Sequence, residues 1–105
     1  MTAVEDRRLT FVIPAYNEAP AIPSVLRAIQ RVVESEHLEA EVIVVDDGST
    51  DGTAAAALAH GARVISIPMN VGYGAALRRG IEAAAHGRII IADMQTVLVL
   101  ANRKS

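Results

Sequence analysis

Apolar residues gather in four short runs, and segments with helical spacing or a high alanine content separate them. The runs, which are rich in Val or Ile and predict strands, span residues 9–13, 40–45, 63–67 and 88–92. The intervening segments, which predict helices, span residues 21–35, 53–60 and 75–86. This β-α-β-α-β-α-β order is typical of an α/β domain with a mostly parallel sheet and right-handed crossovers.

Turn-forming residues mark where these elements begin and end. Pro14 should close the first strand, because proline cannot donate to a sheet ladder. Asp51 or Thr53 is placed to cap the second helix, and Gly61 is placed to end it. The unbroken apolar run at residues 42–45 indicates that the second strand is buried on both faces.

The end of the chain departs from this pattern. Residues 96–101 are apolar and strand-like, and they follow the fourth strand almost at once. A parallel neighbour would need a crossover of about a dozen residues, so we expect a hairpin arm, an extension of the preceding element or exposed apolar surface. The chain is therefore predicted to be one domain over residues 9–95 with an atypical tail over residues 96–105.

Composition narrows the class of protein. The chain has 105 residues, of which 51% are hydrophobic, and its net charge of -2 predicts no nucleic-acid partner. It contains no cysteine, which excludes disulfides and thiolate metal sites. No apolar stretch reaches the roughly 20 residues of a membrane span, and the N-terminus does not look like a signal peptide. These features predict a cytoplasmic protein.

The most informative feature is a β-branched strand that stops at Asp46 and Asp47. In a parallel sheet the loops after strands one, two and four meet at one edge, where ligands bind. The other two loops carry Tyr16 with Glu18, and Asp93. Carboxylates that converge in an empty site repel each other, and a sugar nucleotide with Mg²⁺ or Mn²⁺ would relieve that repulsion. The sequence therefore predicts a sugar-nucleotide site.

Structural roles remain open for each of these residues. Asp46 and Asp47 could open a turn or cap a helix, and Tyr16 could pack over the edge of the sheet. Glu18 could favour the first turn of a helix, and Asp93 alone is only a carboxylate after a strand. The joint arrangement, rather than any single residue, favours ligand binding.

The glycines before the third helix do not form a dinucleotide fingerprint. That fingerprint needs a third glycine where Leu77 stands, and it should follow the first strand. This argues against an NAD-dependent dehydrogenase. Gly72 and Gly74 instead predict a tight turn into the helix. The small residues expected to pack closely in that helix are Ala75, Ala76 and Gly80.

Three motifs resemble the N-terminal half of family-2 glycosyltransferases, most nearly the polyprenyl- or dolichyl-phosphate mannosyl- and glucosyltransferase branch. They are V-I-P-A-Y-N-E at 12–18, V-V-D-D-G-S-T-D-G-T at 44–53 and N-x-G-x-G-A-A-L-R-x-G at 70–80. The resemblance implies a truncated, Rossmann-like GT-A nucleotide-binding half. It also implies a UDP- or GDP-hexose donor, inverting transfer to an acceptor such as a polyprenyl phosphate at the inner face of the membrane, and Mg²⁺ or Mn²⁺ as cofactor.

The resemblance further implies roles for individual residues. The family's metal-binding Asp-x-Asp follows the fourth strand; Asp93 matches its second aspartate and would hold the metal, whereas the first aspartate falls on Ile91. No catalytic residue is assigned. The residues expected to contact the nucleotide sugar are Pro14, Tyr16, Glu18, Val45, Asp46, Asp47, Ala92 and Asp93.

After Gln95 the resemblance ends. We therefore expect a truncated or frameshifted product, or a piece of a longer protein, with weak or no turnover by itself. The exposed edge of the fourth strand would then favour a homo-oligomer. The alternative is a catalytically inactive nucleotide-binding or assembly module, which metal-independent binding of a nucleotide would favour.

Overall fold

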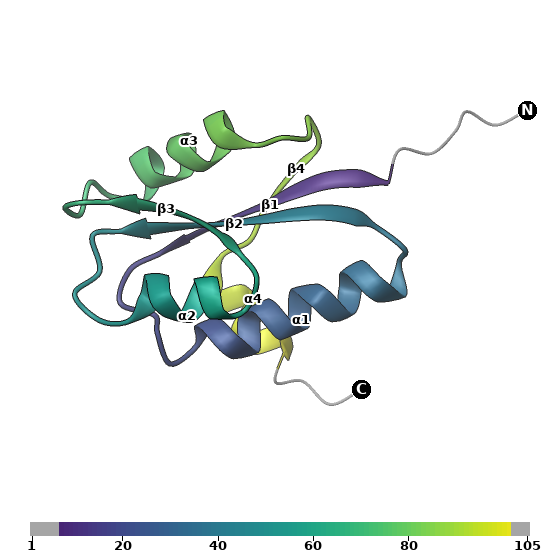
Figure 1. The fold of residues 1–105 in the computed structure, drawn as a ribbon, viewed down its shortest axis with the longest axis horizontal. Coiled ribbons are helices and arrows are strands. Elements are labelled where there is room, and N and C mark those ends of the chain that lie inside the picture. Colours follow the sequence, from purple (N-terminus) through teal and green to yellow (C-terminus); the bar gives the residue numbers. More distant parts are fainter. Residues whose placement is uncertain (1–6, 102–105) are drawn as a thin grey trace, which may run out of the picture.

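The computed structural model describes residues 7–101, with side chains as far as residue 97. Within that range four strands form one parallel sheet in the order β3-β2-β1-β4 (Figure 1). The α/β class and the parallel sheet predicted from the sequence are confirmed. The elements are β1 (Arg8–Ala15), α1 (Ile22–Ser35), β2 (Glu39–Asp47), α2 (Thr53–Ala59), β3 (Arg63–Ile67), α3 (Tyr73–Ala83), β4 (Ile89–Ile91) and α4 (Met94–Ala101).

Helices cover both faces of the sheet. Helices α1, α2 and α4 lie on one face, and α3 lies on the other (Figure 1). The strand pleat divides the core accordingly: Phe11 and Val44 pack on the α1 side, and Val12, Ile43 and Val45 pack on the α3 side. Because both faces are buried, β1 and β2 carry continuous apolar runs rather than alternating ones.

The prediction that the first strand ends at Pro14 is wrong, because β1 continues to Ala15. The N–H of Thr10 donates to the carbonyl oxygen of Arg88, and the carbonyl oxygen of Val12 accepts the N–H of Ala92. The backbone polar groups of the even-numbered residues of β1 therefore face β4. The pairing with β4 extends only as far as Val12. The N–H that Pro14 lacks would therefore point beyond the end of that pairing, and the proline does not interrupt the ladder.

Helix α3 ends at Ala83, earlier than predicted. The N–H of Ala85 donates to a carboxylate oxygen of Glu41 at 2.9 Å, and the N–H of His86 donates to the hydroxyl of Thr10 at 3.3 Å. These bonds to β1 and β2 replace the next helical bonds and turn the chain toward β4.

The prediction of a strand-like tail is wrong, because this segment forms α4. A short apolar run cannot by itself distinguish a strand from a helix. The helix begins after Asp93, whose Oδ2 accepts the N–H and the hydroxyl of Thr96, each at 3.0 Å, as an N-cap does. Met94 and Val97 pack against the core beside α1. Residues 102–105 of the tail lie outside the described range. No helix within residues 7–101 has both the length and the apolar character needed to cross a membrane.

Candidate functional site

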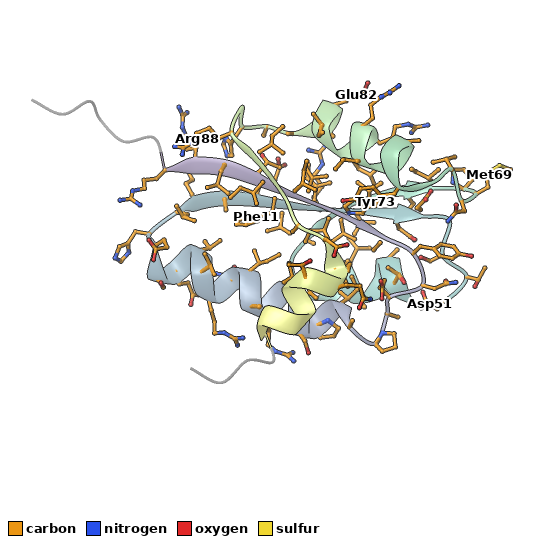
Figure 2. The ribbon with its side chains drawn as sticks, turned by 180° about the vertical axis from the view of Figure 1, so that it is seen from behind. Phe11, Asp51, Met69, Tyr73, Glu82 and Arg88 are labelled. Carbon is orange, nitrogen blue, oxygen red and sulfur yellow. The ribbon has the colours of Figure 1, made fainter. Side chains whose placement is uncertain are left out.

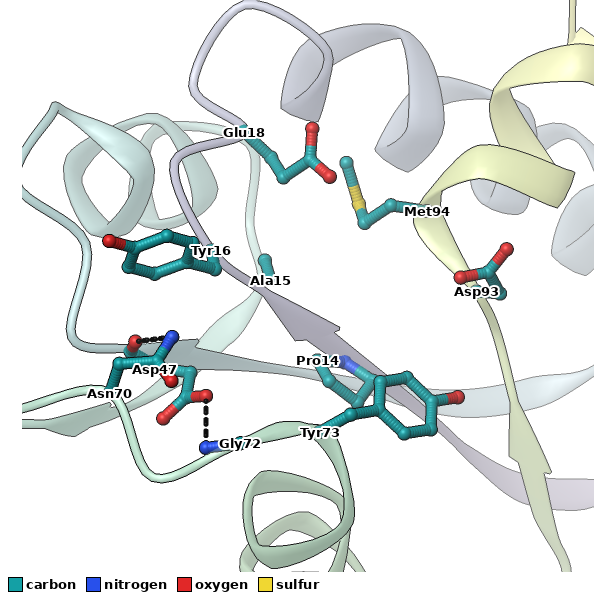
Figure 3. Close-up of a pocket in the computed structure, with 10 residues that line it drawn as sticks. All are labelled: Pro14, Ala15, Tyr16, Glu18, Asp47, Asn70, Gly72, Tyr73, Asp93 and Met94. Atoms are coloured by element: carbon teal, nitrogen blue, oxygen red, sulfur yellow. Dashed lines mark hydrogen bonds between the residues drawn. The ribbon is translucent and has the colours of Figure 1, made fainter.

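An open pocket of about 260 Å³ lies at the carboxyl ends of β1 and β2 (Figure 3). It is next to the point where the strand order reverses, between β1 and β4, which is where open α/β sheets bind ligands. The pocket is lined by Pro14, Ala15, Tyr16, Glu18, Asp47, Asn70, Gly72, Tyr73, Asp93 and Met94.

Five of the predicted ligand-binding residues line this pocket, and they come from three separate segments at the carboxyl ends of β1, β2 and β4. The group consists of Pro14, Tyr16, Glu18, Asp47 and Asp93. The carboxyl ends of parallel strands and the loops that follow them share one edge of a sheet. The expectation that these loops converge is therefore met by the fold, although their contacts with a ligand remain a prediction.

Val45, Asp46 and Ala92 do not line the pocket. Val45 is fully buried on the α3 side of the sheet, and Ala92 is buried on the α1 side. Asp46 is only 8% exposed, and its Oδ1 accepts the N–H of Ser49 at 3.0 Å. The strand β2 runs through Asp47, so the pleat sends the two aspartates to opposite faces. The expectation that both face one crevice is therefore wrong.

Asp47 ties the loop before α3 to the end of β2. Its Oδ1 accepts the N–H of Val71 at 2.8 Å, and its Oδ2 accepts the N–H of Gly72 at 3.0 Å. The Asn70 amide also donates to the Asp47 carbonyl oxygen at 3.3 Å. Beside it, Gly48 has a φ of +75°, and the neighbouring loop backbone occupies the space that a Cβ would need. Asp47 therefore has a structural role, whatever it contacts in a ligand.

Asn17 joins the loops that follow β1 and β2. Its backbone N–H donates to the Ser49 hydroxyl at 2.9 Å, and its side-chain oxygen accepts the N–H of Thr50 at 2.8 Å. Asn17 has a φ of +52°, a left-handed conformation that asparagine tolerates better than most residues. This geometry fixes the backbone next to Tyr16.

Asp51 and Thr53 extend the same contact between loops. Asp51 accepts the N–H of Thr53 at 2.9 Å and of Ala19 at 3.2 Å, and it also accepts the Thr53 hydroxyl. The Thr53 oxygen in turn accepts the N–H of Glu18 at 3.0 Å. The hydrogen bond from the Thr53 hydroxyl, followed by those from the backbone, lowers the pKa of Asp51 below its usual value. Asp51 thus holds Thr53 at the start of α2 and also holds Glu18 in place. The N-cap of α2 is Gly52, so the prediction that Asp51 or Thr53 caps this helix is wrong.

We call this contact the loop latch. It consists of Asn17, Glu18 and Ala19 on one side and Ser49, Thr50, Asp51 and Thr53 on the other.

The sequence interpretation missed the contribution of the loop after β3. Gly72 was expected to form a turn, which its φ of +97° confirms, whereas Gly74 lies within α3. The loop after β3 ends at the same edge of the sheet, and this position could have identified Tyr73 as a candidate. The pocket-lining residues not predicted are Ala15, Asn70, Gly72, Tyr73 and Met94.

The carboxylates suit a metal only together with an anionic ligand. Among the described residues, no three His, Asp or Glu side chains lie close enough together to hold a metal ion. Asp93 uses Oδ2 for Thr96, and its Oδ1 has no hydrogen-bond partner within the described part of the chain. Mg²⁺ often takes only one or two protein carboxylates and completes its shell with water and substrate phosphates. Asp93 fits that arrangement, and Ile91 cannot supply a second carboxylate.

Comparison with known proteins agrees with this geometry. Residues 10–94 match the family described as Glycosyl transferase family 2. The chain is 37% identical over 98 residues to glucosyl-3-phosphoglycerate synthase of Mycobacterium tuberculosis (strain H37Rv), covering 87% of this chain and 30% of that protein. It is 40% identical over 92 residues to the synthase of Mycolicibacterium paratuberculosis, covering 81% of this chain and 27% of that protein.

Solved structures of the M. tuberculosis synthase superpose on this fold. The complex with Mn²⁺, UDP and glucosyl-3-phosphoglycerate has a TM-score of 0.70 at 37% identity, over 84% of this chain and 33% of that one. The complex with Mg²⁺ and UDP has a TM-score of 0.70 at 36% identity, with the same coverage. The present chain therefore spans about a third of the length of these relatives. The polyprenyl- or dolichyl-phosphate branch is not confirmed by these matches.

Proposed function

This chain belongs to glycosyl transferase family 2, and on that premise we propose that it is the donor-binding part of a hexosyltransferase. The donor is a nucleotide sugar, with UDP-glucose as the first candidate, because the M. tuberculosis synthase has been solved with UDP-glucose and Mn²⁺. The observation that carries the proposal is the pocket itself, which gathers Tyr16, Glu18, Asp47 and Asp93 at the carboxyl edge of the sheet.

Each pocket residue has a distinct part in this proposal. Tyr16 is 48% exposed and offers an aromatic face to the base, while Glu18 and Asp47 accept hydrogen bonds from the base or the ribose. Asp93 would hold Mg²⁺ or Mn²⁺ together with the diphosphate. When bound, the metal stabilises the nucleoside diphosphate as a leaving group. The residues of this chain bind and orient the donor, and transfer follows at its anomeric carbon, with inversion expected from the family resemblance.

Isothermal titration calorimetry of the chain with UDP, GDP and CDP, with and without Mn²⁺, tests the donor site. We expect UDP to bind best and to need the metal. Asp93→Asn should remove most of the metal-dependent affinity while keeping the N-cap of α4, because asparagine caps as well as aspartate. Glu82→Gln, an exposed carboxylate on α3 outside the pocket (Figure 2), is the matched control. Failure of all three nucleotides to bind in the presence of metal would overturn the proposal.

The acceptor is a second element of the proposal. The relatives named above are synthases of glucosyl-3-phosphoglycerate, so a small phosphorylated acid is the first candidate, and a polyprenyl phosphate at the membrane face is the alternative. Each acceptor is supplied to the chain with UDP-glucose and Mn²⁺, and any residual UDP release above that without acceptor distinguishes them. We expect little turnover, since the chain spans about a third of the synthases. Rapid turnover would contradict this. Metal-independent nucleotide binding would instead favour an inactive binding or assembly module.

The third part of the proposal is self-association through β4. Within the described residues β4 pairs with β1 on one side only, and Ile90 and Ile91 are 45% and 47% exposed. An apolar edge of this kind favours pairing with a second copy. Sedimentation velocity over a range of concentrations should show a dimer, and replacing Ile90 by Lys should weaken it. A monomer at every concentration would refute self-association.

A further inference from the structure

We propose that Tyr73 recognises the diphosphate of the donor through its hydroxyl group, in a pocket whose described lining residues include no basic side chain. The inference rests on the proposed function and adds a specificity-determining residue to it. The family resemblance assigns no role to this tyrosine, and only the structure brings it to the pocket.

The chain has two tyrosines, and both line the pocket. Tyr16 is 48% exposed and Tyr73 is 53% exposed, and neither hydroxyl forms a hydrogen bond with a described residue. In Figure 3 the two rings lie on different sides of the pocket. The Tyr16 ring lies near Asp47 and Asn70, whereas Tyr73 projects past Pro14 with its hydroxyl on the side where Asp93 lies. The tyrosines are therefore suited to different parts of one ligand.

The charges of the pocket-lining residues show why an uncharged hydrogen-bond donor matters for the diphosphate. Its charged lining residues are Glu18, Asp47 and Asp93, and none of the described lining residues is Lys, Arg or His. Arg78 and Arg79 of α3 lie outside the lining. A diphosphate carries several negative charges and would be repelled by three carboxylates. A cation and neutral hydrogen-bond donors would both favour its binding.

Some hydrogen-bond donors close to the pocket already have partners. The N–H groups of Val71 and Gly72 donate to the Asp47 carboxylate, and the Asn70 amide donates to the Asp47 carbonyl oxygen. Two side-chain donors with no partner among the described residues remain in the lining, the hydroxyls of Tyr16 and Tyr73. Only the second lies on the Asp93 side, where the metal and the diphosphate would be (Figure 3).

The backbone of Tyr73 is held firmly. It is the first residue of α3, directly after Gly72, whose N–H is bound to Asp47 at 3.0 Å. Helix α3 is in turn packed on β1 and β2. A ligand that contacts the ring therefore does not have to order the backbone that carries it, which favours specific recognition.

The test compares Tyr73→Phe, an exposed substitution that removes the hydroxyl and keeps the ring, with Glu82→Gln, an exposed substitution outside the pocket. Affinities for UDP with Mn²⁺ are measured by calorimetry, and binding of uridine, which lacks phosphate, is followed by NMR chemical-shift titration. We expect Tyr73→Phe to weaken UDP binding about tenfold without changing uridine binding. Glu82→Gln should change neither, because Glu82 lies outside the pocket. Equal melting temperatures of the variants exclude a folding effect.

A spectroscopic measurement adds a direct readout. The chain has no tryptophan, so in the Tyr16→Phe variant Tyr73 is the only tyrosine that emits. Its fluorescence should change on addition of UDP with Mn²⁺ and stay constant with uridine.

The outcomes separate this inference from the proposed function. If the wild-type chain binds UDP with Mn²⁺ and Tyr73→Phe binds equally well, the role of Tyr73 is overturned and the donor site stands. If Tyr73→Phe weakens uridine to the same degree, Tyr73 contacts the nucleoside and the inference is again overturned. If the wild-type chain binds no UDP at all, the proposed function fails and the inference fails with it.

Discussion

Replacing Gly80 by alanine should push α3 away from the sheet and lower the stability of the fold. Gly80 is buried, and a Cβ built on it would overlap Cγ1 of Val12 and come within 3.0 Å of Cγ2 of Val45. Both valines are fully buried and branched at Cβ, so neither side chain can rotate away easily. Gly74, in the same helix, has no atom within 4 Å of the position that a Cβ would take, and it provides the matched control.

The expected magnitudes have opposite signs at the two glycines. Overpacking a core costs about 1–3 kcal/mol, whereas exchanging glycine for alanine in a helix gains about 0.5–1 kcal/mol. Gly80→Ala should therefore lose about 1–2 kcal/mol net, which corresponds to a fall of roughly 5–15 °C in melting temperature for a domain of this size. Gly74→Ala has only the favourable contribution and should melt at the same temperature as wild type or a few degrees higher.

Thermal and urea unfolding followed by circular dichroism measure both variants. Calorimetry with UDP and Mn²⁺ should also show weaker binding by Gly80→Ala, because α3 carries Tyr73 into the pocket. If Gly80→Ala is as stable as Gly74→Ala, α3 does not pack on β1 and β2 as closely as described, and the reasoning is refuted.

Three further substitutions probe the loops and the far end of the sheet. Gly48→Ala, at a φ of +75° and against the loop backbone, should lose about 2 kcal/mol or more in urea unfolding and bind UDP poorly in calorimetry. Asn17→Ala should lower stability by about 1 kcal/mol through the loop latch, and an unchanged melting temperature would count against the latch. Burial alone would raise the pKa of Glu41, but hydrogen bonds from the Ala85 N–H and the Arg63 guanidinium outweigh it and lower the pKa. The ionised Glu41 therefore stabilises the fold above its ordinary pKa, and this contribution is lost as the pH falls below about 4. In Glu41→Gln the free energy of unfolding by urea should fall less steeply between about pH 6 and about pH 3 than in wild type. An equally steep fall in the variant would refute this expectation.

The fold was predictable where a pattern had one physical solution. The run around Val44 is apolar on both faces, and only a strand covered by helices on both sides satisfies it. The tail failed for the opposite reason, since an apolar run such as the one around Val97 suits a strand or a helix equally. The deciding signal was Asp93 three residues before Thr96, a helix N-cap that the interpretation as a metal ligand obscured.

The candidate site was predictable to the level of loops but not of side chains. That Asp47 and Asp93 lie at one edge follows from parallel topology alone. Which of two adjacent aspartates faces the pocket depends on where β2 ends, and strand ends are set by pairing with β3 rather than by local sequence. The position of Tyr73 in the pocket depends on the conformation of the loop after β3. Asp47 holds that loop through hydrogen bonds that no local sequence pattern indicates.

The motif residues divide into those that face the pocket and those that hold its loops together, and this division has a measurable consequence. Asn17 and Asp51 belong to the loop latch, so replacing either should lower the melting temperature and the affinity for UDP together. Within the described part of the chain the Tyr73 hydroxyl has no hydrogen-bond partner, so Tyr73→Phe should lower the affinity alone. Loss of nucleotide binding by itself therefore does not identify a ligand contact in this motif. A latch variant that lost affinity with an unchanged melting temperature would show that Asn17 or Asp51 contacts the nucleotide directly.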